Sequence, residues 1–228
     1  EELRYVSHLD YANLFVRACK RAGLPMAYSE GFNPHMKVAF ASALSLGAAS
    51  DAEYVDFEMT EELPPHEVMQ RLRDQLPRGA EIIRLRLQEG KHRALMADVD
   101  EARYRLKIPY EGELAPVRES VRRYNSAAHA VWERVTPKKS RSIETKEYIK
   151  APISFQYENG CLILWMNLLV TPAGSVKPIE VLRVMARDFA LPVDPAAASV
   201  TRTGPAPYTH LPLQTNHPPR PLLTPRCI

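Results

Sequence analysis

The segment ISFQYENGCLILWMNLLV, residues 153–170, constrains the fold more than any other part of this chain. Asn159-Gly160 separates two strand-like stretches, and an Asn-Gly pair in that setting is the strongest short-range sign of a two-residue β-hairpin. The second stretch is broken by Asn167 and falls well short of the ~18 apolar residues of a membrane-spanning helix. The segment therefore predicts two antiparallel strands of a buried sheet.

In the first part of the chain, amphipathic helices alternate with short strands. Apolar residues recur three and four positions apart from Leu9 to Cys19 and predict a helix, which Gly23 ends. A second helix follows Pro64-Pro65. The end of a strand is predicted at Tyr5-Val6, with further strands at 25–29, 37–44, 53–59 and 80–88. This order is the split βαβ pattern of a ferredoxin-like domain.

The same order returns loosely after a polar stretch. The second set of predicted elements is a strand at 102–110, a helix at 116–133, the hairpin, a helix at 177–190 and a strand at 198–203. The predicted fold class is α+β, with two tandem ferredoxin-like (split βαβ) modules built on antiparallel sheets and an irregular Pro-rich C-terminal tail. The predicted domains are a first ferredoxin-like module at 1–87, a linker at 88–101, a second module at 102–203 and the tail at 204–228.

Charge and cysteine content narrow the class of protein. Residues 51–67 hold seven acids and no Lys or Arg, whereas residues 116–150 hold nine Lys or Arg against four acids. One acidic and one basic flank suggest a polar partner on a defined side, although both can also be solvated faces. Three widely spaced cysteines argue against disulfides and against a zinc or iron–sulfur site, so we expect no metal and no cofactor. With no apolar span and no signal segment, we expect a cytoplasmic protein without a membrane partner.

The segment SEGFNPHMKVAF, residues 29–40, combines turn formers with polar and aromatic side chains just before an apolar strand. Glycine lets a backbone approach a ligand closely, and an aromatic ring can stack on an unpaired base. The start of the first helix offers backbone N–H groups to an anion. In the alternative interpretation the phenylalanine is a core plug and its neighbours only form the turn. The ligand-binding or RNA-binding candidates are Ser7, His8, Gly31, Phe32, Asn33, His35 and Lys37, and we expect the loop and the helix start to face each other.

Two histidines raise a catalytic alternative. If His8 and His35 approach each other, one imidazole can take the 2′-OH proton of RNA while the other protonates the leaving oxygen. Lys37 would then steady the charge that develops on the phosphorane. Against this, a histidine at a helix start or in a loop often has only a local role.

A second candidate surface is the basic stretch RVTPKKSRSIETKEYIK, residues 134–150. Phosphate contact explains the type and spacing of its basic residues, and so does simple solvation. The candidate RNA-binding residues in this stretch are Lys138, Lys139, Arg141 and Lys146.

The motifs YVSHLD, RAGLP and GFNPHMK, at residues 5–10, 21–25 and 31–37, resemble those of a known bacterial family. It is the uncharacterised radical-SAM-associated domain family, a domain of unknown function found beside or fused to radical SAM proteins. The likeness is dense over residues 4–59 and continues more weakly, through SRSIETKEYI, to about residue 203. Met36 stands where the family usually has proline.

The resemblance implies an accessory role in radical SAM chemistry, with the radical SAM protein as a partner in trans or fused. The genomic neighbours of that family, ribosomal proteins and an RNase E/G-type ribonuclease, imply RNA as a second partner. The two-module plan is also similar to that of CRISPR repeat-processing endoribonucleases, but only at the level of the fold.

Three hypotheses follow. The favoured one is an accessory RNA-binding protein that works with a radical SAM enzyme in tRNA or rRNA modification or processing. The second is a metal-independent endoribonuclease that uses His8 and His35. The third is a protein-interaction scaffold that docks a radical SAM partner through the acidic residues 51–67 without nucleic acid. Salt-dependent RNA binding separates the first two from the third, and metal-free cleavage of RNA separates the second from the first.

Overall fold

The chain folds into two compact units, each built from helices and antiparallel strands. The computed structural model describes residues 2–89, 95, 99–137, 139–171, 174–205 and 223–227. The first unit is Glu1–Val99 with Pro207–Ile228, and the second is Asp100–Ala206. The prediction of a fold that mixes helices and sheets is confirmed. Within the described residues, no helix is long and apolar enough to cross a membrane.

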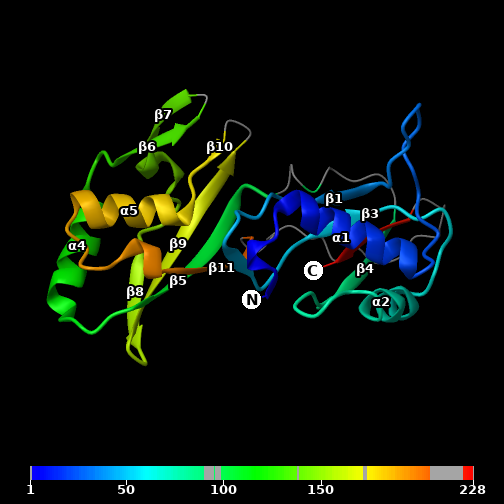
Figure 1. Ribbon diagram of the computed structural model, residues 1–228, viewed down its shortest axis with the longest axis horizontal. Coiled ribbons are helices and arrows are strands. Elements are labelled where there is room, and N and C mark those ends of the chain that lie inside the picture. The colour runs from blue at the N-terminus through cyan, green and yellow to red at the C-terminus, as the bar shows by residue number, and fades with distance from the viewer. Residues whose placement is uncertain are drawn as a thin grey trace. The chain divides into compact units, whose positions relative to one another are not determined.

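The first unit packs two helices against a four-stranded sheet (Figure 1), whose strands run in the order β1-β3-β12-β4 with every neighbouring pair antiparallel. The core joins Phe15 and Cys19 of the first helix, Leu72 of the second and Phe57 of the sheet. Burial raises the pKa of the Cys19 thiol to about 12. The elements are the 3-10 helix η1 (Glu2–Tyr5), α1 (His8–Arg21), β1 (Val38–Phe40), β2 (Ala48–Ser50), β3 (Val55–Phe57), α2 (Pro65–Arg73), β4 (Leu85–Glu89) and β12 (Leu223–Cys227).

Helix α1 begins and ends where the sequence predicts. The Ser7 side chain accepts a hydrogen bond from the backbone N–H of Asp10 at 3.1 Å and donates one to the Asp10 carboxylate at 2.7 Å. This satisfies one of the backbone donors left open at a helix start. After the helix, Gly23 adopts a φ of +61°, a conformation that favours glycine.

Two features at the ends of the chain differ from the prediction. The strand expected to end at Tyr5-Val6 is replaced by the 3-10 helix η1. In the tail, which was expected to be irregular from residue 204, residues 223–227 form the strand β12 between β3 and β4, and residues 206–222 lie outside the described residues. Strands β3 and β4 each offer a row of backbone groups that a further strand can pair, and β12 pairs both rows.

In the second unit, α4 and α5 lie on one side of a sheet (Figure 1). The sheet order is β8-β9-β5-β11, with β10 pairing the end of β9, and all neighbouring strands are antiparallel. The elements are β5 (Glu101–Pro109), α4 (Leu114–Ser126), β6 (Val131–Thr136), β7 (Lys139–Glu144), η2 (Thr145–Tyr148), β8 (Ser154–Glu158), β9 (Cys161–Thr171), β10 (Gly174–Ser175), α5 (Pro178–Asp188), η3 (Pro195–Ala197) and β11 (Ser199–Pro205).

The predicted hairpin at Asn159-Gly160 is confirmed. Strand β8 ends at residue 158 and β9 begins at residue 161. Asn159 and Gly160 have φ angles of +51° and +72°, and positive values at both positions are what a type I′ turn requires. The turn sets the register that runs from Glu158 opposite Cys161 to Ser154 opposite Trp165.

The helix predicted at 116–133 is shorter than expected. Helix α4 ends at Ser126, and the C-cap residue Ala127 is already extended. Residues 131–136 form β6, which pairs with β7 as a separate two-stranded sheet. The reason lies in the β-branched Val131 and Val135 with Trp132, which fit a strand better than a helix. The helical sequence pattern of α4 hid the change from helical to strand-like spacing of apolar residues.

Candidate functional site

The loop of residues 29–35 is closed at its base by hydrogen bonds between its two ends. The backbone N–H of Ser29 donates to the carbonyl of His35 at 2.8 Å, and the N–H of His35 donates to Ser29 Oγ at 3.0 Å. Ser29 Oγ also lies 2.8 Å from Nδ1 of the His35 ring. Directly outside this pair, Tyr28 and Met36 form an antiparallel bridge. His35 therefore holds the loop in shape through one of its ring nitrogens.

The tip of this loop presents an apolar side chain to solvent. The segment between α1 and β1 projects from the first unit (Figure 1), and the Phe32 side chain is 106% exposed. Gly31 has a φ of +116°, and a Cβ built there would meet nothing within 4 Å. The core-plug interpretation of Phe32 is therefore excluded. The tip, residues 30–34, is exposed throughout.

The other candidates of the first unit have local partners. His8 lies at the first position of α1, with its ring 5.4 Å from the ring of Phe40. Lys37 forms an ion pair with Glu58 at 2.7 Å, and this hydrogen bond raises the pKa of Lys37. The extended chain from His35 to Phe40 spans roughly 16 Å, at about 3.3 Å per residue. The structure therefore does not bring the two imidazoles together, and the Ser7 hydroxyl is engaged in capping α1.

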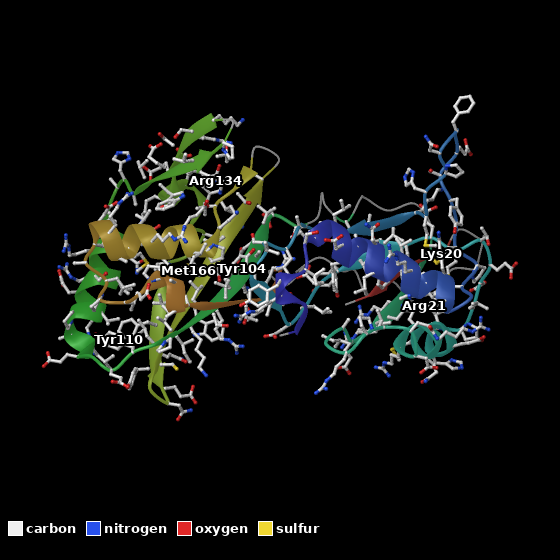
Figure 2. The ribbon with its side chains drawn as sticks, viewed as in Figure 1. Lys20, Arg21, Tyr104, Tyr110, Arg134 and Met166 are labelled. Atoms are coloured by element: carbon white, nitrogen blue, oxygen red, sulfur yellow. The ribbon has the colours of Figure 1, made fainter. Side chains whose placement is uncertain are left out.

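In the second unit, the β6–β7 hairpin is fixed to α5 by a partly buried ion pair. Arg134 donates from Nε to Glu180 Oε1 at 2.7 Å and from Nη2 to Oε2 at 2.6 Å, and Nη2 also reaches the carbonyl of Ser175 at 3.0 Å. Glu180 accepts a further bond from the backbone N–H of Lys177 at 2.8 Å. Burial of Glu180 raises its pKa, but the Arg134 and Lys177 donors outweigh burial and hold it below its usual value. Figure 2 shows Arg134 between the hairpin and α5.

Lys146, predicted to contact phosphate, instead supports the end of α4. Its ammonium donates to the carbonyls of Tyr124 at 2.8 Å and Asn125 at 3.1 Å, and it lies 4.6 Å from the centre of the Tyr124 ring. Burial lowers the pKa of Lys146, partly offset by Glu144. Next to it, the buried Thr145 hydroxyl bonds to Tyr124 at 2.9 Å and Ala130 at 2.7 Å. This part of the SRSIETKEYI segment therefore anchors the helix C-terminus.

The remaining basic candidates lie on the hairpin itself. Lys139 and Arg141 are exposed on β7, and Lys138 lies outside the described residues. Arg141 is opposite Arg134 in the register, so both are on the hairpin face that meets α5. A Cβ placed on Gly174 would be 3.8 Å from Arg141 Nη1, which puts Arg141 beside β10.

Sequence reasoning missed the contribution of α5 to this surface. Arg183 and Arg187 both lie 5.8 Å from the centre of the Trp132 ring. Arg187 also donates to the carbonyl of Val131 at 2.8 Å and pairs with Asp188. The four-residue spacing of the two arginines was the available signal, because it puts both on one helix face. We call Lys139, Arg141 and Arg183 the basic hairpin surface.

Metal and family comparisons complete the description of the site. In the described part of the chain, no group of three or more His, Cys, Asp or Glu side chains could hold a metal ion. No curated protein matches the chain. Residues 1–178 match a bacterial family described as "uncharacterized protein conserved in bacteria (DUF2344)". The match covers well over half of the chain, and the protein belongs to this family.

Proposed function

We propose that the protein is an accessory RNA-binding protein that works with a radical SAM enzyme in tRNA or rRNA modification or processing. The observation that carries the RNA-binding part is the basic hairpin surface. No described acidic side chain forms an ion pair with Lys139, Arg141 or Arg183, whereas other basic residues nearby are paired. Exposed cations on a hairpin and on the helix to which it is tied are suited to contact phosphates.

The attachment of the hairpin to α5 supports binding rather than simple solvation. The Arg134–Glu180 pair fixes the hairpin to α5, and Trp132 packs beside two α5 arginines. Side chains presented by such a fixed frame lose less conformational freedom on binding than those of a mobile loop. The radical SAM partner rests on the resemblance of the loop and helix motifs, and the exposed Phe32 ring of the loop is a candidate to stack on an unpaired base.

We interpret both units as ferredoxin-like modules. In the second unit, the order β8-β9-β5-β11 with α4 after β5 and α5 after β9 follows the split βαβ plan, with the β6–β7 hairpin as an insertion. In the first unit, β12 takes the position of the strand expected before α1. Sheets of this kind serve as binding platforms in several RNA-binding modules.

The two alternative functions have less support. The endoribonuclease needs His8 and His35 in one site, but His8 lies against Phe40 and His35 closes its own loop. The scaffold hypothesis needs a free acidic flank, but Glu58 is paired with Lys37 and Glu67 with Arg71. No described contact favours either alternative function over RNA binding.

The test measures binding of a 5′-labelled single-stranded RNA of 12 nucleotides by fluorescence anisotropy at several salt concentrations. Replacing Lys139, Arg141 and Arg183 together by Ala should weaken binding and flatten the slope of log K against log salt by about 0.7 per lost contact. The matched control removes three exposed arginines of α4, namely Arg118, Arg122 and Arg123. Equal effects of the two triple variants would mean that net charge alone attracts RNA, and absence of binding by the wild type would refute the proposal.

A further inference from the structure

The sheet of the second unit has one covered and one open face. Side chains at even positions from 102 to 108 and from 162 to 168 are buried, among them Tyr104 and Met166, which Figure 2 labels. Val121 of α4 and Leu182 of α5 are buried as well, and both helices lie on one side of this sheet (Figure 1). Because side chains alternate along a strand, the odd positions of β5 and β9 lie on the opposite face. None of the residues at odd positions from 103 to 107 or from 161 to 169 is buried.

The open face carries cations along its central strand. The odd positions of β5 from 101 to 107 are one acid and three cations: Glu101, Arg103, Arg105 and Lys107. Glu101 lies 3.7 Å from Arg103 Nε and 3.6 Å from Lys150 Nζ, so its charge is balanced at that end of the strand. Successive cations on one face are about 6.6 Å apart, two residues along the strand. Arg105 is engaged in an interaction of its own, whereas Arg103 and Lys107 are both exposed and lie about 13 Å apart along the strand.

A tryptophan lies next to these cations. In the register, Trp165 of β9 is opposite Arg105 of β5, which is opposite Thr201 of β11. One step along, Ile163 is opposite Lys107, and one step back, Asn167 is opposite Arg103. Cross-strand partners lie within about 5.5 Å, so the indole, the cations and the amide form one continuous patch. We call Arg103, Lys107, Trp165, Asn167 and Thr201 the open sheet face.

We infer that the open sheet face holds single-stranded RNA, with a base stacked on Trp165 and the backbone in contact with Arg103 and Lys107. This inference rests on the proposed RNA-binding function and assigns to it a second surface, separate from the basic hairpin surface. An aromatic ring on the uncovered face of a four-stranded sheet is a proven stacking platform for unpaired bases. Amide and hydroxyl groups such as Asn167 and Thr201 supply hydrogen bonds to base edges and to the 2′-OH. The cations favour a polyanion over an apolar protein partner.

The test uses the two tryptophans of the chain, Trp132 and Trp165. The Trp132→Phe variant leaves Trp165 as the only indole reporter and keeps an aromatic ring beside α5. Titration with the unlabelled 12-nucleotide RNA should quench its fluorescence, with a midpoint equal to the affinity measured by anisotropy. Quenching that occurs only in the reverse variant, Trp165→Phe, would assign the stacked base to the hairpin and overturn the inference.

Affinity measurements supply the second arm. Trp165→Leu should weaken RNA binding by ~5- to 150-fold, the range expected for one lost base stack. Lys107 is exposed, so Lys107→Gln should leave the fold intact. This variant should flatten the slope of log K against log salt by about 0.7. If RNA binds and the hairpin triple variant weakens it, while Lys107→Gln and Trp165→Leu leave affinity and slope unchanged, the open sheet face is refuted and the proposed function stands. If wild-type protein binds no RNA at low salt, both fail together.

Discussion

Removal of the Glu180 carboxylate tests how the basic hairpin surface is held in place. In the Glu180→Ala variant, Arg134 loses both of its bonds to the carboxylate, and the backbone N–H of Lys177 at the start of α5 loses its acceptor. The Glu180 side chain is 6% exposed and that of Arg134 is 29% exposed. The guanidinium is therefore left only partly solvated, with its bond to the Ser175 carbonyl as the remaining contact among those described here.

The expected loss of stability follows from these exposures. Breaking a fully buried ion pair by removing one partner costs about 3–5 kcal/mol, and loss of a side-chain capping bond at a helix start costs about 1 kcal/mol. Because Arg134 keeps partial contact with water, the first figure must be reduced. We expect Glu180→Ala to lower the free energy of unfolding by about 2–4 kcal/mol. The exposed pair of Glu119 with Arg122 is the matched control, and Glu119→Ala should leave the free energy of unfolding close to that of the wild type.

The assay is urea unfolding of the full chain in a Trp165→Phe background, where Trp132 reports the hairpin. A double-mutant cycle of Arg134→Ala and Glu180→Ala should give a coupling energy of about 2 kcal/mol or more. Since the folded pKa of Glu180 lies below the unfolded one, the stabilisation is fully present above the unfolded value of about 4.3. The difference between wild type and Glu180→Gln should then shrink as the pH falls through the lower, folded pKa. Additive single variants, or a difference that does not change with pH, would refute this account of the hairpin.

Three further predictions concern residues with a defined local role. Lys146→Met should lower the free energy of unfolding by about 1–2 kcal/mol, because two helix carbonyls lose their donor; urea unfolding measures this, and an unchanged RNA salt slope would separate it from phosphate contact. Gly31→Ala should destabilise the closed loop by about 1–2 kcal/mol through its positive φ alone, whereas Phe32→Ala should stay within about 0.5 kcal/mol of wild type. Wild-type protein should not cut RNA in EDTA, as judged by gel analysis after long incubation, and metal-free cutting abolished in His8→Ala or His35→Ala would contradict the separation of the two rings.

The sequence predicted those elements whose signals are local. The Asn159-Gly160 turn and the Ser7 cap depend on residues a few positions apart, and both are found as expected. The β6–β7 hairpin was missed because its strands follow α4 without a Gly or Pro to mark the change. The strand β12 was missed because its pairing partners are more than 100 residues away, and no local pattern encodes such a contact.

The candidate site residues show the same limit of prediction from local sequence patterns. The residue types around the loop suggested a shared pocket, but whether His8 and His35 meet depends on which strand each lies against. The open sheet face could not be predicted from the sequence for a related reason. Arg103 and Asn167 are 64 positions apart, and only the strand register puts them opposite each other. Sequence reasoning could find the chemistry of each residue but not its neighbours across a sheet.

The local charge excess of residues 116–150 acquires a different meaning once the contacts are known. Arg134 neutralises Glu180, the Lys146 ammonium caps α4, and Lys150 pairs with two acids at the start of β5. These cations have structural roles, because moving them toward a phosphate would break contacts that hold the hairpin and the helix. Lys139 and Arg141 carry no such role among the described residues. The basic stretch therefore contains two groups of cations. One group has structural roles and holds the hairpin and the helix in place. The smaller group lies on the same hairpin and remains available to a polyanion.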